Sequence, residues 1–149
     1  MSSLAFACAL VCLVASIALS TGTSATAGPA PDNLHGCSVG ALRGLYVFAW
    51  DGYADLGGNL VPKAVMEGKR FNGDGTTFNE FGTVNIGDTT IIDTTGGGGI
   101  YTVAADCTGT LSVPNGPSFG FYVGPGAQQI RFNQTAGGIG SGTATRLRW

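Results

Sequence analysis

The feature that most constrains this chain is a series of short apolar segments separated by turns rich in glycine. Glycine fills 26 of the 149 positions, and about eight or nine such segments follow one another at spacings of roughly ten residues. No segment after Cys37 has the apolar spacing that an amphipathic helix needs. With no linker long enough for a crossover helix, neighbouring strands should pair antiparallel.

The clearest predicted strand is 45–51, where Tyr46, Phe48 and Trp50 alternate with smaller side chains on the opposite face. A helical turn within 38–45 precedes it, and bends are expected near Gly82 and Gly109. The predicted strands are 45–51, 64–71, 76–86, 89–94, 99–107, 108–113, 118–123, 128–134 and 142–148. Because closure removes exposed strand edges, we predict an all-β, up-and-down barrel of about eight strands over residues 37–149. A β-sandwich is the alternative.

The segment 72–75 (Asn-Gly-Asp-Gly) predicts a hairpin, since these residues tolerate positive φ. The same residues resemble a fragment of a calcium loop, but such a loop needs more oxygen ligands than this segment offers. We therefore predict a turn and no metal site.

The N-terminal segment has the pattern of an export signal. Residues 4–19 are an uninterrupted apolar run of 16 residues, which is short of the ~20 needed to cross a bilayer. Ala25-Thr26-Ala27 then fits the small-x-small pattern of a cleavage site. We predict a signal peptide over 1–27, a flexible leader over 28–36, and a secreted or periplasmic protein free of the membrane after cleavage. An uncleaved membrane anchor is the alternative.

Cysteine usage agrees with export. Cys8 and Cys12 lie in the signal peptide, so the mature chain keeps Cys37 and Cys107. Two cysteines in an exported chain predict one disulfide; two free thiols are the alternative.

Charge and composition argue against several classes of function. Charged residues make up 11% of the chain and its net charge is −2, whereas a nucleic-acid binder normally carries a basic patch. The one histidine, His35, leaves almost no material for a zinc site or a serine triad. We expect no cofactor and no nucleic-acid partner, and a non-enzymatic role is favoured.

Aromatic side chains supply the candidate ligand site. In a barrel of this size they either fill the interior or line a pocket for one small apolar ligand. The residues expected at such a pocket are Tyr46, Phe48, Trp50, Phe71, Tyr101 and Phe121. Arg131 is the remaining candidate: it would anchor an anionic group if it pointed inward, and it would be a surface residue if it pointed outward. Interior acids among Asp51, Glu67, Glu80 and Asp106 would be candidates for acid–base chemistry.

Several motifs together resemble a family of small exported bacterial proteins with no settled function. They are Cys37 followed by 42–46 (Leu-Arg-Gly-Leu-Tyr), the hairpin 71–75, the segment 99–103 running into 106–110 (Asp-Cys-Thr-Gly-Thr), and 129–132. The resemblance covers about residues 37–148 and implies a secreted barrel that is lipocalin-like or similar in outline to allene oxide cyclase. It carries over no catalytic residue.

These observations favour a secreted barrel that serves as a binding or structural module, with a small hydrophobic ligand as the expected partner. One alternative is an enzyme of the cyclase or isomerase type that uses an interior acid or tyrosine. A second is a surface protein that self-associates, because low charge weakens the repulsion between copies.

Overall fold

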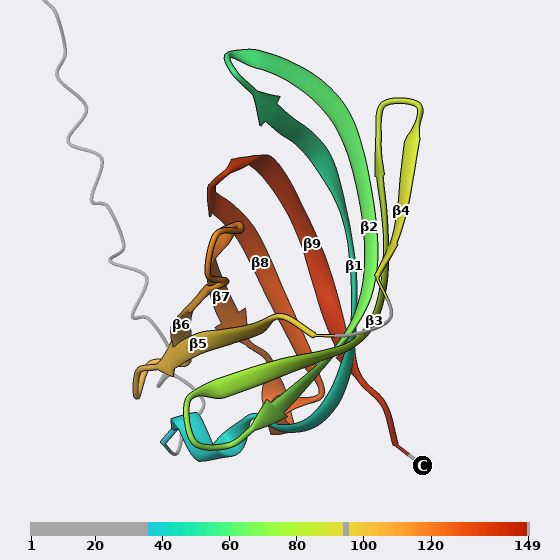
Figure 1. Ribbon diagram of the computed structural model, residues 1–149. Helices are drawn as coiled ribbons and strands as arrows, with labels where there is room; N and C mark the ends of the chain where they lie inside the picture. Colours follow the sequence, from blue (N-terminus) through green and yellow to red (C-terminus); the bar gives the residue numbers. More distant parts are fainter. Residues whose placement is uncertain (1–35, 94–95, 149) are drawn as a thin grey trace, which may run out of the picture. The chain divides into compact units, whose positions relative to one another are not determined.

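The computed structural model describes residues 36–93 and 96–148, which form nine strands and two short 3-10 helices (Figure 1). The strands are β1 (Arg43–Leu56), β2 (Asn59–Asn72), β3 (Thr76–Ile86), β4 (Thr89–Asp93), β5 (Gly98–Val103), β6 (Thr108–Ser112), β7 (Ser118–Val123), β8 (Gln129–Ala136) and β9 (Gly138–Arg146), and the 3-10 helices are η1 (Val39–Ala41) and η2 (Pro125–Ala127). The predicted signal peptide, its cleavage position, the leader up to residue 35 and His35 lie outside the described residues. Neither described helix has the length and apolarity that a membrane-crossing helix requires.

The strands form one antiparallel sheet that closes on itself. Their order is β2-β1-β9-β8-β7-β6-β5-β3-β4, and β2 also pairs with β3. Eight strands therefore make a closed barrel, and β4 is an extra strand paired with β3. The predicted barrel is confirmed, and the sandwich alternative is wrong.

The extra strand β4 can pair with β3 because β3 changes partners along its length. Its first residues, Thr76–Phe78, pair with β5, whereas Gly82–Ile86 pair with β4. The turn of the β3–β4 hairpin and that of the longer β1–β2 hairpin both lie at one end of the barrel, the upper end in Figure 1. We call this the hairpin end.

The opposite end, which we call the η1 end, is closed by η1 and by a disulfide. The Cys37–Cys107 bond joins residues 70 positions apart, as predicted. The Tyr101 hydroxyl lies 2.9 Å from the Val39 carbonyl oxygen and 3.0 Å from that of Leu42. The Tyr46 hydroxyl donates a hydrogen bond of 2.6 Å to the Ala127 carbonyl. Both 3-10 helices are therefore tied to the barrel by buried tyrosines.

Alternation along each strand separates the interior from the surface. Tyr46, Phe48 and Trp50 of β1 face inward, as predicted, and none is more than 7% exposed. Ala49 and Asp51, which lie between or beside them, are exposed. The interior is completed by residues from β2, from β5 to β9, from η2 and from the turns: Leu42, Val65, Phe71, Tyr101, Cys107, Leu111, Phe119, Phe121, Val123, Ala127, Ile130, Phe132 and Ala144.

The predicted element bounds need several corrections. The strands predicted over 45–51 and 64–71 are too short, because β1 and β2 continue and pair as far as Leu56 and Asn59. The strand predicted over 99–107 ends at Val103, since residues 104–107 form a turn in which Cys107 has a φ of 69°. The expected helical turn is the 3-10 helix η1 alone. The last strand begins at Gly138 rather than at position 142.

The hairpin predicted at 72–75 is confirmed as the β2–β3 turn. Asp74 Oδ1 accepts hydrogen bonds from the backbone N–H and the hydroxyl of Thr76, at 2.9 and 2.6 Å. The hydroxyl bond, followed by the backbone bond, lowers the pKa of the Asp74 carboxyl. In the β5–β6 turn, Asp106 Oδ1 likewise accepts hydrogen bonds from the backbone N–H and the hydroxyl of Thr108. The bend expected at Gly82 is instead a register shift of the β2–β3 pair beside Gly68 and Lys69.

Candidate functional site

The two lysines of the chain, Lys63 and Lys69, both lie inside the barrel. They share the interior-facing side of β2 with Val65 and Phe71. Lys63 is 8% exposed and Lys69 is fully buried. Burying an ammonium group is costly unless partners compensate its charge. The partners of the two lysines therefore show which of the two charges is compensated by other groups inside the barrel.

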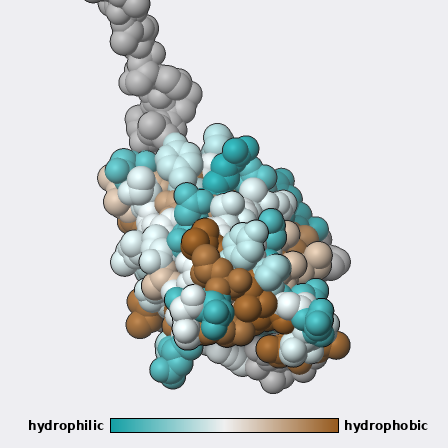
Figure 2. All heavy atoms as spheres, turned by 90° about the horizontal axis from the view of Figure 1, so that it is seen from above, coloured by the Kyte–Doolittle hydropathy of each residue, from teal (hydrophilic) through white to brown (hydrophobic). Residues whose placement is uncertain are grey.

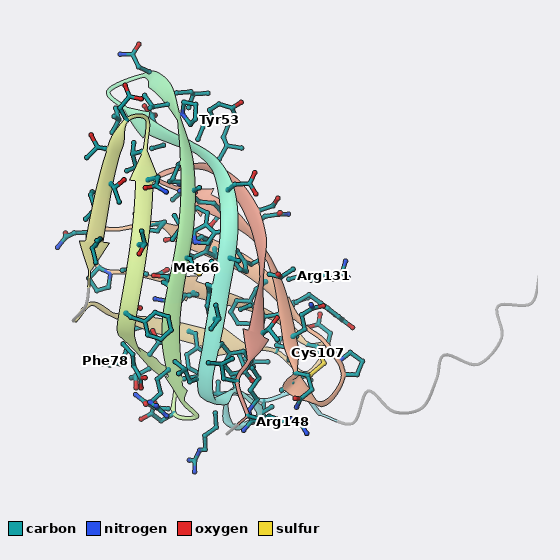
Figure 3. The ribbon with its side chains drawn as sticks, turned by 90° about the vertical axis from the view of Figure 1, so that its right-hand side faces the viewer. Tyr53, Met66, Phe78, Cys107, Arg131 and Arg148 are labelled. Carbon is teal, nitrogen blue, oxygen red and sulfur yellow. A yellow bond between two sulfur atoms is a disulfide. The ribbon has the colours of Figure 1, made fainter. Side chains whose placement is uncertain are left out.

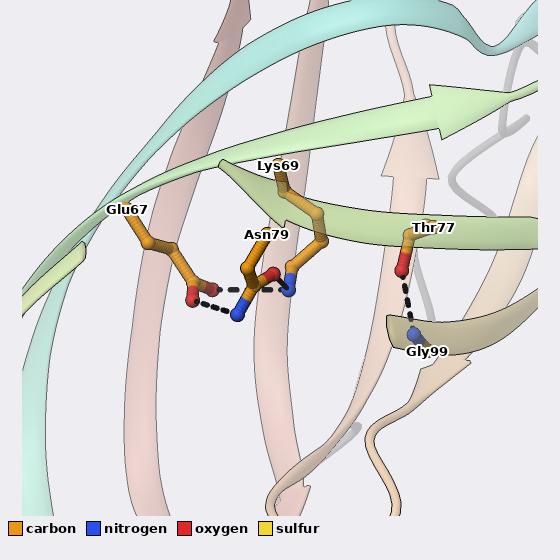
Figure 4. Close-up of polar contacts among 5 residues, drawn as sticks. All are labelled: Glu67, Lys69, Thr77, Asn79 and Gly99. Carbon is orange, nitrogen blue, oxygen red and sulfur yellow. Dashed lines mark hydrogen bonds and ion pairs between the residues drawn. The ribbon is translucent and has the colours of Figure 1, made fainter. Parts of the chain in front are cut away.

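Lys69 belongs to a closed polar cluster (Figure 4). Its Nζ donates a hydrogen bond to Asn79 Oδ1 and lies 3.6 Å from Glu67 Oε1. Asn79 Nδ2 in turn lies 3.3 Å from Glu67 Oε2 and donates to it. The β2–β3 register places Asn79 directly opposite Lys69. Burial lowers the pKa of Lys69, and the Glu67 carboxylate opposes that effect. The cluster pairs one cation with one anion.

Lys63 has no such partner. Its Nζ donates a hydrogen bond of 2.7 Å to the neutral side chain of Gln134 and lies 4.2 Å from the centroid of the Trp50 ring. Within the part of the chain that the structure describes, Lys69 and Arg70 make ion pairs and Lys63 does not. Burial lowers the pKa of Lys63, and no carboxylate opposes the effect. Lys63 is thus a buried cation without a counter-ion.

Two glycines allow Lys63 to reach Gln134, although β2 and β8 are not neighbours in the sheet. Lys63 pairs with Gly52 of β1, and Gly52 pairs with Gly140 of β9. The last pair of the β8–β9 register is Asn133 with Ser141, and Gln134 and Gly140 are the next residues along these two strands. Because neither glycine has a side chain, the lysine and the glutamine meet across two intervening strands. Their hydrogen bond lies above Trp50.

Trp50 contributes a hydrogen-bond donor that has no partner. Its Nε1–H is buried and has no hydrogen-bond partner among the described residues. Leaving a buried donor unpaired costs about 1–3 kcal/mol. The indole is held by close packing, since a Cβ on Gly142 would lie 2.3 Å from Trp50 Cβ. An uncompensated ammonium such as Lys63 is a donor from which an anion such as a carboxylate accepts strong hydrogen bonds.

The aromatic residues predicted to bind ligand are all buried, but they do not all surround this site. The Phe71 ring packs against the rings of Tyr46, Phe48 and Tyr101, with centroids 4.8 to 6.1 Å apart. Phe121 packs over Gly109, where an added Cβ would lie 2.4 Å from its ring. Of the predicted set, Trp50 is the residue whose ring the Lys63 ammonium contacts. Whether any of these residues binds a ligand stays a prediction.

Arg131 points outward. It is exposed and pairs with Tyr122 of β7 in the β7–β8 register, on the outer face of the barrel (Figure 3). The predicted alternative of an interior Arg131 is wrong, because its neighbours Ile130 and Phe132 are the buried residues of β8.

The candidate acids divide between the interior and the surface of the barrel. Glu67 faces the interior and belongs to the Lys69 cluster. Glu80 pairs with Arg70, whereas Asp51 and Asp106 are exposed. Sequence reasoning did not find Lys63 or Gln134, because the second strand was begun at residue 64. The signal was present, since Lys63 has the same parity along the strand as Phe71.

The chain matches no family model, no curated protein and no solved structure. The resemblance to small exported bacterial proteins therefore stays a prediction, whereas the barrel that it implied is confirmed by the fold.

Proposed function

We propose that this protein is a secreted barrel that binds one small amphipathic anion, such as a medium-chain carboxylate, at the hairpin end. The observation that carries the proposal is Lys63, a buried ammonium that lies over the ring of Trp50 and has no carboxylate partner among the described residues. Export is supported by the apolar run 4–19 and by the Cys37–Cys107 disulfide, which is typical of oxidising compartments.

The charge of the site favours an anion. On the interior face of β2, Lys63 and Lys69 supply two cations and Glu67 one carboxylate, and that carboxylate already serves Lys69. A ligand carboxylate supplies the missing charge, and it exchanges a neutral amide acceptor, Gln134, for an ionised one. Hydrogen bonds to ionised acceptors are roughly twice as strong as neutral ones.

The hairpin end also offers apolar surface for the rest of the ligand. Tyr53, Leu56 and Leu60 of the β1–β2 hairpin are 47%, 54% and 53% exposed. Figure 2, seen from this end, shows apolar atoms gathered among polar ones. Each CH₂ that such a surface covers stabilises binding by about 0.8 kcal/mol.

The interior groups that a cyclase or isomerase would use are engaged in structural bonds, which supports binding rather than catalysis. The Tyr46 and Tyr101 hydroxyls lie against backbone carbonyl oxygens at the η1 end. Burial raises the pKa of both tyrosines. Glu67 is held between Lys69 and Asn79.

Calorimetric titration with dodecanoate and with the neutral dodecanol tests the proposal. We expect Lys63→Met to weaken dodecanoate binding at least tenfold, which corresponds to about 1.4 kcal/mol, and to leave dodecanol binding unchanged. Arg148→Met is the matched control, because it removes one positive charge from an exposed site at the other end of the barrel (Figure 3). Lys63→Arg should retain most of the affinity. Equal binding of dodecanoate by wild type and Lys63→Met would contradict the proposal.

Self-association is a second candidate function, and the edge of the sheet favours it. β4 ends the strand order and pairs with β3 alone among the described strands, so one row of its backbone groups has no strand partner. Ile91 and Ile92 are 48% and 72% exposed. A groove of about 520 Å³ beside them is lined by residues that include Met66 and Phe81. A second copy that pairs β4 with β4 would extend the sheet and cover these apolar side chains.

Sedimentation velocity tests this second candidate. We expect the wild type to form dimers as its concentration rises and Ile92→Lys to remain monomeric. A wild type that stays monomeric at millimolar concentration would rule it out.

A further inference from the structure

A groove of about 670 Å³ lies on the outer face of the barrel over β7, β8 and β9. It is separate from the Lys63 site, because its side chains come from the outward-facing positions of these strands. Tyr122, Arg131 and Asn133 are exposed along it, and Ser141 and Thr143 complete its polar lining. We propose that this groove binds a neutral oligosaccharide, a function beyond the ligand site inside the barrel.

The register arranges the groove residues in two rows that run across the strands. Adjacent strands lie ≈ 4.7–4.9 Å apart, so each row presents donors and acceptors at regular intervals. The rows are Tyr122–Arg131–Thr143 and Gly120–Asn133–Ser141–Asp51. A chain of linked sugar rings laid along the first row meets a polar side chain at each of β7, β8 and β9.

Gly120 leaves a gap in the second row that the fold does not require. Its φ is not positive, and a Cβ there would meet only Thr135 Cγ2, at an ordinary 3.6 Å. Glycine within a strand costs roughly 0.5–1 kcal/mol relative to alanine. Gly142 differs, because there a Cβ would clash with Trp50. The missing side chain at Gly120 thus serves the outer surface, where it leaves room beside Tyr122.

The groove side chains keep their hydrogen-bonding capacity for a ligand. On the outer face of the neighbouring strands, hydroxyl groups pair with each other, at 2.8 Å for Thr102–Thr110 and 3.3 Å for Ser118–Ser112. Within the described residues, no such side-chain bond joins the two rows over β8 and β9.

The chemistry of this lining suits a sugar better than a lipid or an anion. Tyr122 is 44% exposed and offers a ring face to the C–H groups of a pyranose. Arg131 and Asn133 are planar groups that can donate two hydrogen bonds to neighbouring hydroxyls. One cation, Arg131, and one nearby carboxylate, Asp51, leave the two rows without net charge. A neutral ligand rich in hydroxyl groups matches this combination.

Titration with three hexasaccharides, β-1,4-glucose, β-1,4-N-acetylglucosamine and α-1,4-glucose, tests the proposal by calorimetry. We expect at least one to bind, and both Tyr122→Ala and Gly120→Val to weaken that binding at least tenfold. Tyr53→Ala is the matched control, since Tyr53 is 47% exposed at the hairpin end, and it should change the affinity less than twofold.

A denaturation midpoint of Gly120→Val that is no lower than that of wild type would show that the loss is local. Dodecanoate binding by Tyr122→Ala and Gly120→Val should be unchanged, so this test is independent of the interior site. Failure of all three hexasaccharides to bind, full affinity in Gly120→Val, or an equal loss in Tyr53→Ala would overturn the proposal.

Discussion

Lys69 and Lys63 occupy the same face of the same strand, yet their surroundings differ in kind. Lys69 lies deeper, and an amide and a carboxylate satisfy it. Lys63 lies toward the hairpin end, and a neutral amide and an aromatic face are its contacts. Both ammonium groups are removed from water, but only one has its charge compensated.

This difference separates the part of the barrel that maintains the fold from the part that we propose as the ligand site. Toward the η1 end, the buried polar groups of Tyr46, Tyr101 and Lys69 have partners from the chain itself. Toward the hairpin end, Trp50 Nε1 has no partner among the described residues, and the partner of Lys63 is a neutral amide that does not compensate its charge. Local departures of this kind are expected at functional sites.

The largest expected effect is the loss of stability in Lys69→Met. Removing one partner of a buried pair leaves the other charge uncompensated, and the cost is about 3–5 kcal/mol. Chemical denaturation of wild type and variant measures it, and Glu67→Gln in the same chain should recover part of the loss. A loss below about 1 kcal/mol would show that the Lys69 cluster is not structural.

The next largest effect is the change in stability on replacing two glycines whose missing side chains would lie on opposite faces of the sheet. Gly142→Ala should destabilise the barrel by about 1–3 kcal/mol, because its Cβ would overlap Trp50. Gly120→Ala should leave stability unchanged or raise it by roughly 0.5–1 kcal/mol. Thermal unfolding measures both, and an equal loss in the two variants would mean that the Trp50 contact is not what distinguishes them.

Much of the fold was predictable because its signals are local. The alternation of Tyr46, Phe48 and Trp50 and the hairpin at 72–75 each depend on a few consecutive residues. The disulfide followed from counting cysteines once the predicted signal peptide was set aside. The outward direction of Arg131 was also open to prediction, since both of its neighbours are large and apolar.

The site was not predictable to the same degree, because it depends on pairings between distant strands. The contact between Lys63 and Gln134 requires the combined register of β2, β1, β9 and β8. Sequence patterns define which residues share a face, but not which faces meet across the barrel. The aromatic residues were correctly expected in the interior, yet most of them pack at a distance from Lys63.

A smaller effect is expected for Lys63→Met, whose stability should lie within about 1 kcal/mol of wild type or above it. Replacing an uncompensated buried charge by an apolar group of similar volume is often neutral or stabilising. Denaturant titration measures this in parallel with Lys69→Met. A loss as large as that of Lys69→Met would remove the distinction between the two lysines.

The smallest effect is the change of stability with pH in the alkaline range. Burial lowers the pKa of Lys63 and of Lys69 from the ordinary value of 10.5, so the unfolded chain binds more protons just below that pH. Stability should therefore rise as the pH approaches 10.5 from below. Burial also raises the pKa of Tyr46 and Tyr101 from 10.0, so tyrosine ionisation in the unfolded chain lowers stability above that pH.

Denaturation midpoints measured between neutral pH and this range should therefore pass through a maximum. Lys63→Met should show a smaller rise than wild type does. An identical rise in the two proteins would show that Lys63 is not desolvated.

The most direct test uses the fact that the chain contains two lysines. Isotope labelling of lysine gives two side-chain signals in the NMR spectrum of the native protein, and Lys63→Met assigns them. We predict that dodecanoate shifts the Lys63 signal and raises its pKa, while the Lys69 signal stays in place. A dodecanoate titration that moves neither signal, or moves that of Lys69 instead, would contradict the account.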